Sequence, residues 1–187
     1  MTRKQAPSSP IHPTPPAPSP KKTRRVIVCM FKGGTGKSTI AGNVAVGLAR
    51  RSRSVALVDL DAQGNTTDML GHANHGTNGM YSVIVEGVDP SKVAVTVESG
   101  LTLLPSSRAL APIDSWLTMQ MRREQVLQKR LQTLTGFDYI ILDTGPAFSL
   151  LNLNALCFAT EIWLPVAMEY FSLSGLAQVQ ETLHMVK

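Results

Sequence analysis

The chain has 187 residues, of which 43% are hydrophobic, and this is enough for one domain with a substantial core. Its formal net charge of +5 is unevenly placed, because residues 1–25 hold six basic and no acidic side chains, which leaves 12 basic against 13 acidic residues in 26–187. The composition therefore excludes a uniformly basic folded body of the kind that binds nucleic acid over its whole surface. The sequence predicts neither a secretory signal nor a membrane span, so we expect a cytoplasmic protein.

The N-terminal segment differs from the rest of the chain. Residues 1–23 contain seven of the twelve prolines and too little apolar surface to offset the entropy of ordering. We therefore expect a disordered, proline-rich basic arm over 1–23 and one folded domain over 24–187. The six basic residues assigned to the arm and its junction are Arg3, Lys4, Lys21, Lys22, Arg24 and Arg25.

Beyond the arm, short apolar runs alternate with segments of helical period. Strands are predicted over 25–30, 55–61, 101–105, 137–143 and 161–166. Helices are predicted from Lys37, where Ile40, Val44 and Leu48 recur every four residues with Ala41 and Ala45 beside them, and over 119–134, 150–158 and 172–186. Residues 72–98 give an ambiguous pattern. Strands that alternate with helices predict an α/β fold with a mainly parallel sheet flanked by helices. The two cysteines, Cys29 and Cys157, are interpreted as buried thiols in a reducing compartment, with a disulfide or shared metal as the alternative.

The stretch "CMFKGGTGKST" (29–39) lies between the first strand and the first helix, and it departs from the common phosphate loop G-x-x-x-x-G-K-[ST]. Phe31 stands where the common loop has its first glycine, and a second lysine, Lys32, follows. Gly33, Gly34 and Gly36 allow the backbone N–H groups to form an anion nest at the helix N-terminus. In such a loop Lys37 reaches the β- and γ-phosphates and the Ser38 hydroxyl binds Mg²⁺.

Acidic residues follow two of the apolar strands. Asp59 and Asp61 end the run 55–61, and Asp143 ends the run 137–143. Ligands of parallel sheets collect at the carboxyl ends of the strands, so these acids are expected beside the phosphate loop. One such acid could cap the next helix, but three together favour binding of Mg²⁺ and water.

Four stretches resemble the ParA/MinD group of ATPases, which carry a deviant Walker A phosphate loop. They are "KGGTGKST" (32–39), "VDLDAQGNTT" (58–67), "FDYIILDTGPAFSLLNLNAL" (137–156) and "LPVAMEYFSLSGL" (164–176). Gln63, Gly64 and Asn65 favour the ParA branch, which partitions chromosomes and plasmids. Gly145 is a departure, because the family usually has proline there, and we expect a looser turn after Asp143.

The resemblance implies a P-loop NTPase fold and roles for individual residues. Asp61 would orient the attacking water, and Asp59, Asp143 and Ser38 would support Mg²⁺. Lys32 would reach across a dimer interface to phosphates bound by the other subunit, which makes it both a catalytic group and part of a dimerisation switch. Nucleotide binding is implied for the whole loop, which consists of Lys32, Gly33, Gly34, Thr35, Gly36, Lys37, Ser38 and Thr39.

The resemblance also implies a function, with ATP and Mg²⁺ as cofactors. ATP would close a homodimer that binds DNA without sequence preference, a ParB-like partner would stimulate slow hydrolysis, and a DNA cargo would be segregated. Family members usually continue beyond the equivalent of Lys187, so we expect this chain to lack the family's C-terminal elements and part of its DNA-binding surface. The alternative is an ATP-binding scaffold with little hydrolysis, which positions a protein cluster rather than DNA.

Three further features leave alternatives open. His72 and His75 could hold a metal, but a solvated loop is the simpler interpretation. Arg122, Arg123, Lys129 and Arg130 could form a DNA-binding stripe or the solvated face of a helix. The arm could bind DNA phosphates, in which case its deletion would reduce both affinity and salt dependence, or it could dock on a partner protein. The segment after the last predicted strand has too few basic residues for a membrane-binding helix.

Overall fold

A six-stranded sheet forms the centre of the computed structural model, which describes residues 22–30, 33–72 and 79–166. The strands are β1 (Arg24–Val28), β2 (Val55–Asp59), β3 (Val95–Glu98), β4 (Leu101–Leu104), β5 (Tyr139–Asp143) and β6 (Glu161–Trp163). Their order is β3-β4-β2-β5-β1-β6, and every pair is parallel except the antiparallel pair β3–β4. The expected α/β fold with a mainly parallel sheet is confirmed.

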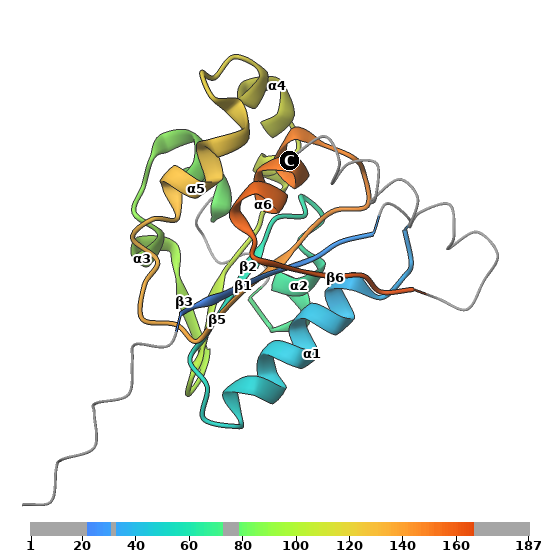
Figure 1. The fold of residues 1–187 in the computed structure, drawn as a ribbon, viewed down its shortest axis with the longest axis vertical. Coiled ribbons are helices and arrows are strands. Elements are labelled where there is room, and N and C mark those ends of the chain that lie inside the picture. Colours follow the sequence, from blue (N-terminus) through green and yellow to red (C-terminus); the bar gives the residue numbers. More distant parts are fainter. Residues whose placement is uncertain (1–21, 31–32, 73–78, 167–187) are drawn as a thin grey trace, which may run out of the picture.

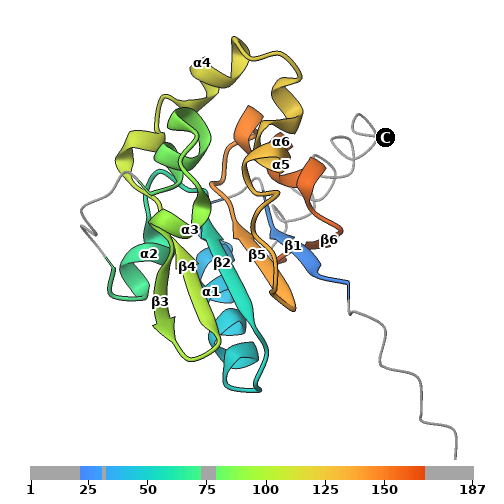
Figure 2. The ribbon, with the colours of Figure 1, turned by 90° about the vertical axis from the view of Figure 1, so that its left-hand side faces the viewer.

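Helices cover both faces of this sheet. The longest is α1 (Lys37–Ala49), which packs on one face, whereas α4, α5 and α6 lie on the other (Figures 1 and 2). The remaining elements are short: α2 (Asn65–Met69), the π-helix η1 (Ser82–Glu86), α3 (Pro90–Val93), the 3-10 helices η2 (Arg108–Leu110) and η3 (Arg123–Gln125), α4 (Ile113–Thr118), α5 (Val126–Arg130) and α6 (Leu150–Phe158). None of the helices within the described ranges is long and apolar enough to cross a membrane.

The continuous apolar strands are explained by burial on both faces. Side chains alternate across each strand, so Ile27, Val58 and Leu142 join the core under α4–α6. Val26, Leu57 and Ile141 join the core under α1. All six are buried, which is why these strands lack an apolar–polar alternation.

The helical period predicted for α1 is confirmed, and its contact with the sheet is centred on the alanines beside the predicted row, while Val44 and Leu48 pack at the edge of the same core. The residues packed on the sheet are Ala41, Ala45 and Ala49, whereas Ile40 is 37% exposed. The small alanine side chains allow the helix backbone to lie close to the sheet, and the larger side chains then point to its flanks.

The single helix predicted over 119–134 was also wrong. Arg122 lies between α4 and η3 and has a φ of 52°, in the left-handed region, so a continuous helix cannot run through this position. Buried Asn154 of α6 supplies the missing backbone partners, since its Oδ1 accepts from Leu127 N–H (3.0 Å) and its Nδ2 donates to Arg123 O (2.7 Å). A tertiary contact from another helix therefore decides this local structure.

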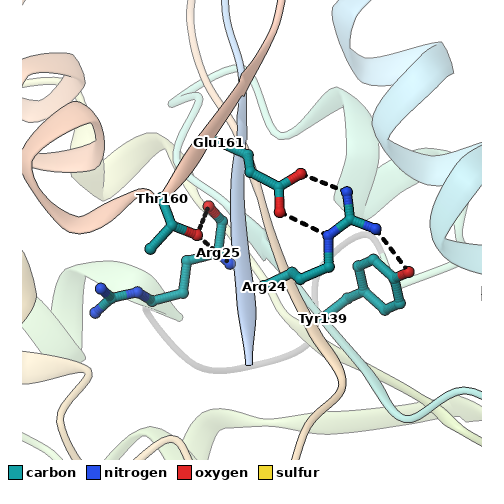
Figure 3. Close-up of polar contacts among 5 residues, drawn as sticks. All are labelled: Arg24, Arg25, Tyr139, Thr160 and Glu161. Carbon is teal, nitrogen blue, oxygen red and sulfur yellow. Dashed lines mark hydrogen bonds and ion pairs between the residues drawn. The ribbon is translucent and has the colours of Figure 1, made fainter. Parts of the chain in front are cut away.

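The junction of the arm with the sheet is part of the fold. Arg24 donates to the Glu161 carboxylate through Nε (2.6 Å) and to the Tyr139 hydroxyl through Nη1 (3.0 Å), as Figure 3 shows. Arg25 points to the other side of β1, and its guanidinium lies 4.8 Å from the centre of the Phe158 ring. Counting these two arginines with the arm was therefore a misinterpretation, because strand pairing brings them beside β5, β6 and α6. Thr23 also belongs here, since its hydroxyl donates to Phe137 O (2.8 Å).

Several sequence predictions fall on residues whose structure is not described. They are the arm predicted over 1–23 as far as residue 21, the fourth motif (164–176) beyond residue 166, the helix over 172–186, and single residues such as Lys32 and His75.

Candidate functional site

The acidic residues predicted from the sequence meet at the carboxyl edge of the sheet. Strand register places Asp59 of β2 directly beside Asp143 of β5, and Asp143 beside Val28 of β1. The chain leaves β1 at this point and enters the glycine-rich loop before α1. The strand order therefore brings the loop, both acids and the start of α1 to one place.

The described part of the loop, Gly33–Gly36, has the backbone form that an anion nest requires. Gly34 and Gly36 have φ values of 74° and 81°, and Gly36 caps α1 while its carbonyl accepts from Ile40 N–H (2.8 Å). A Cβ added to Gly33, Gly34 or Gly36 would meet no atom within 4 Å, so open space faces the loop. The helix N-terminus adds partial positive charge at the same position.

Lys37, the first residue of α1, is 7% exposed and lies among the acids. Burial lowers the pKa of its ammonium, and the Asp143, Asp61 and Cys29 side chains oppose that shift. Cys29 in turn is buried, and desolvation raises the pKa of its thiol to about 11, so it is an unreactive neighbour.

Asp143 is fully buried, and only one of its oxygens has a hydrogen-bond donor. Its Oδ2 accepts from the Thr66 hydroxyl of α2 (2.6 Å), whereas its Oδ1 has no hydrogen-bond partner among the described residues. Burial raises the pKa of this carboxyl, and the Thr66 and Ser38 hydroxyls act in the opposite direction. An acceptor of this kind beside Ser38 suits a cation or a cation-bound water.

Asp59 is also fully buried, but both of its oxygens are occupied. Its Oδ2 accepts from the Thr67 N–H (2.9 Å) and hydroxyl (2.7 Å), and its Oδ1 accepts from Asp61 N–H (3.1 Å). Burial raises the pKa of Asp59 to about 7, and these donors only partly oppose the shift. Asp59 therefore acts first as the anchor for α2 and for the segment that carries Asp61.

Asp61 is half-buried, and neighbours hold both its carboxylate and its backbone carbonyl. Its Oδ1 accepts from Gln63 N–H (2.9 Å), and its backbone carbonyl accepts from the Ser106 hydroxyl (2.6 Å). Ser106 is itself held by a hydrogen bond from its N–H to the Thr67 hydroxyl (2.9 Å). A Cβ on Gly145 would lie 3.6 Å from the Asp61 carboxylate, so the glycine keeps space beside that group.

The turn after Asp143 is held in spite of Gly145. Asn152 of α6 donates through Nδ2 to Gly145 O (3.0 Å) and to Ala147 O (2.6 Å). A buried side chain thus does what the rigid ring of a proline would do at this turn.

Sequence reasoning missed the hydroxyl groups that support the acids. Thr66, Thr67 and Ser106 join the ends of β2, β4 and β5 through α2. Ser106 could have been found from the sequence, because it follows the strand Leu101–Leu104 closely and so lies at the same sheet edge as the acids. Its partner could not be known without the strand order.

Other predicted residues are not brought to this site or fall outside the described ranges. Lys32 and His75 are not described, while Cys29 and Cys157 are free thiols. Within the described ranges no group of three His, Cys, Asp or Glu residues is placed to hold a metal ion by itself. Arg130 does not belong to an exposed stripe, because its Nε donates to Ile84 O (2.9 Å) of η1. Thr35 and Thr39, in contrast, are described and do lie at the site, at the centre of the loop and in the first turn of α1.

A glycine-rich nest at a helix N-terminus, a buried lysine and acids on the adjacent strand ends define a phosphate-loop nucleotide-binding protein. The described residues also fit Mg²⁺, because the Ser38 hydroxyl and the unpartnered Asp143 oxygen are hard oxygen donors. Mg²⁺ usually keeps several of its waters and binds the substrate phosphates, so a site with only two protein oxygens is typical of this ion.

Comparison with known proteins gives the family. Residues 23–187 match the family described as an AAA domain. The chain belongs to this family, as a ParA-type P-loop ATPase.

Among its relatives, the sporulation initiation inhibitor protein Soj of Bacillus subtilis is 36% identical over 160 residues, which cover 83% of this chain and 63% of that protein. The chromosome partitioning protein ParA of Myxococcus xanthus is 36% identical over 166 residues, which cover 86% of this chain and 59% of that protein. The chain thus spans about 60% of the length of these relatives.

The fold also matches a crystal structure of cobyrinic acid a,c-diamide synthase from Mycobacterium smegmatis with bound ADP and magnesium. The TM-score is 0.83 and the sequence identity is 35%, and the match covers 88% of this chain and 68% of the other.

Proposed function

We propose that this chain is an ATP-driven dimerisation switch of the ParA type, which hydrolyses ATP slowly and serves DNA segregation or cargo positioning. The observation that carries the proposal is the carboxyl edge of the sheet, where buried Lys37 lies between the glycine nest, Asp143 and Asp61. The Soj and ParA relatives and the ADP- and magnesium-bound structure support ATP and Mg²⁺ as its cofactors.

In this proposal the loop from Lys32 to Thr39 binds the phosphates. The N–H groups of the nest and the Lys37 ammonium face the β- and γ-phosphates, and burial of Lys37 strengthens that attraction. Mg²⁺, when bound, neutralises developing charge on the phosphates. Ser38 and Asp143 provide oxygens toward it, and Asp59 acts indirectly because both of its oxygens are already bonded.

Asp61 orients the attacking water. Asp61 is half-buried, and its carboxylate lies next to Gly145, which has no side chain to cover it. Gln63 N–H holds the carboxylate, and the Ser106 hydroxyl holds the backbone carbonyl of the same residue. With its Oδ1 already accepting a hydrogen bond, Asp61 is a positioning group rather than a strong base. This supports slow turnover, which suits a timed switch.

Lys32 acts in trans. A lysine placed before the nest can face a second subunit, where its charge stabilises the transition state as an arginine finger does. Closure of the homodimer and stimulation by a ParB-like partner then control the rate. We place the switch in the cytoplasm, on the nucleoid when it binds DNA.

The decisive experiment measures assembly and turnover on the same full chain. Light scattering after size exclusion should show an ATP-dependent dimer for the parent chain and none for Lys32→Ala. Lys92→Ala is the matched control, because it removes an exposed lysine outside the loop. A dimer that forms equally with and without ATP, or equally with Lys32→Ala, contradicts the switch.

Hydrolysis separates this proposal from the alternative scaffold. Phosphate release should rise when DNA and a partner protein are both added, and Asp61→Ala should abolish that rise. Turnover that stays at the background level under every condition, with ATP bound, would instead favour the scaffold that positions a protein cluster.

A further inference from the structure

Charge is strongly segregated along the chain. Residues 1–58 contain 11 of the 18 basic residues and no acid, whereas all 13 acids and the other seven basic residues lie in 59–187. The near-neutral sum of the folded domain therefore hides a separation of charge within it.

Among the described residues, six basic side chains lie at the amino edge of the sheet, opposite the nucleotide site: Lys22, Arg24, Arg25, Arg50, Arg51 and Arg53. The helix α1 runs back along the sheet and ends at Ala49, so the turn over residues 50–54 lies where β2 begins. Backbone bonds connect this turn to the start of β1, since Arg24 N–H donates to Asp138 O (3.0 Å) and Asp138 N–H donates to Ser54 O (2.8 Å). With strands ~4.8 Å apart, the turn and the root of β1 are separated by about 10 Å.

Pairing with acids uses only part of this basic charge. Glu161 engages Arg24 (Figure 3), and the Glu98 carboxylate lies 3.6 Å from Arg50 Nε. Arg51 and Arg53 are exposed, and no carboxylate of the described residues pairs with either. Asp138, the third acid at this edge, accepts instead from Ser54 N–H (3.1 Å).

The turn also shapes a hollow of about 630 Å³ between α1, β2 and the β3–β4 connection. Its polar lining consists of Arg50, Arg53, Ser52, Ser54, Ser99 and one acid, Glu98, whose carboxylate faces Arg50. Ser52 has a φ of 58°, a left-handed conformation that favours glycine, and the Arg53 N–H closes the turn on Leu48 O (3.1 Å). The turn thus holds arginine and hydroxyl donors in a fixed, slightly strained backbone.

We propose that the turn over residues 50–54, together with Lys22 at the root of β1, is a docking surface for the phosphate backbone of duplex DNA. This inference rests on the proposed function only in naming DNA as the partner. Guanidinium and hydroxyl donors around an open hollow suit phosphate oxygens and carry no base readout. An anionic membrane is less suitable, because the large exposed apolar side chains of the described residues, such as Met121, Phe148 and Ile40, lie elsewhere.

The test uses the full chain with Mg²⁺ and ATP, and a short fluorescently labelled duplex of mixed sequence. Arg51→Ala/Arg53→Ala should weaken binding at low salt by about tenfold or more and make the salt slope shallower by about 2. Arg51→Lys/Arg53→Lys keeps both charges and should retain most of the affinity, which excludes a loss through misfolding. Arg122→Ala/Arg123→Ala removes the same charge from the segment between α4 and η3 and should leave affinity within about twofold.

The inference is overturned if the alanine pair at 51 and 53 binds DNA like the parent, or if the 122/123 pair loses as much. It is also overturned if the arginines at 51 and 53 are needed for sedimentation with phosphatidylserine vesicles and not for DNA. Calorimetry of ATP binding distinguishes the two proposals, because both alanine pairs should bind ATP as the parent does. A negative DNA result with intact ATP binding leaves the ATPase proposal standing.

Discussion

At the carboxyl edge of the sheet the charged side chains are acids and a lysine that are buried or half-buried, whereas at the amino edge of the same strands they are mostly exposed and mostly basic. The helix that connects β1 to β2 begins at the first edge and ends at the second. Its N-terminus therefore favours an anionic ligand at the first edge, and its C-terminus favours cationic side chains such as Arg51 at the second. One parallel α/β unit thus places a nucleotide site and a basic surface at opposite ends.

The largest effect is expected where the nest itself is changed. Gly36→Val puts a β-branched side chain at a φ of 81° and into the space that faces the phosphates, so ATP affinity should fall by about 100-fold or more. Isothermal titration with Mg²⁺ and ATP measures this. Gly47→Val, at an exposed site of the same helix, is the control and should bind ATP normally. Equal ATP affinities for the two variants would contradict the assignment of the Gly33–Gly36 loop as the phosphate-binding nest.

A second change should affect chemistry without affecting binding. Asp61→Ala removes the group that orients water and should lower the hydrolysis rate at least about tenfold while ATP affinity is kept. The ATP-bound dimer should persist longer as a result. Asp68→Ala in α2 is the control, because that acid is exposed. If Asp61→Ala hydrolyses ATP at the parent rate, Asp61 does not orient the attacking water, and Asp59 becomes the next candidate for that role.

The amino edge can be tested by shortening the chain. Deletion of residues 2–21 removes Arg3, Lys4 and Lys21, and should weaken DNA binding about tenfold and reduce the salt slope by up to about 3. The deletion stops before Thr23, whose hydroxyl bonds Phe137 O in the folded domain. A matched arm with these three residues changed to Gln separates charge from length. If affinity and slope both stay unchanged, the arm serves a partner protein instead.

A smaller effect is expected for the group that supports Asp61. Ser106→Ala removes the hydroxyl that donates to Asp61 O, so turnover should fall roughly threefold to tenfold with little change in KM. Ser106→Thr keeps a hydroxyl and should restore part of the rate. Ser115→Ala, on the exposed side of α4, is the control. A rise in KM with unchanged kcat would assign Ser106 to nucleotide binding.

The smallest effect concerns the strained turn of the amino edge. Ser52→Gly relieves a positive φ and should raise the free energy of unfolding by about 0.5–1 kcal/mol in urea denaturation. Ser54→Gly lies in the same turn without a positive φ, so it should lower stability. Each variant removes a hydroxyl that lines the hollow but keeps Arg51 and Arg53, so DNA affinity should fall by no more than about twofold. Destabilisation by Ser52→Gly would show that the turn is not strained.

The local pattern of apolar residues in the sequence was enough to predict the strands that are buried on both faces of the sheet. Continuous apolar runs predicted β1, β2, β4, β5 and β6, and the α6 boundaries agree with the prediction because Ser149 caps its first turn. The loop and its acids were also readable, since a glycine nest and an acid at a strand end need no distant residue. Sequence alone therefore determined the fold class and the nucleotide-binding edge.

Only the tertiary structure decided how distant segments complete those edges. Asn154 of α6 replaces helical bonds around Arg123 and Leu127, so the pattern over 119–134 was not followed. Ser106 reaches Asp61 only because β4 lies beside β2. The sequence grouped Arg24 and Arg25 with a basic tail, whereas strand pairing places Arg24 against Glu161 and Arg25 against Phe158. In each case the deciding partner lies 27 or more residues away, beyond the reach of any local periodicity.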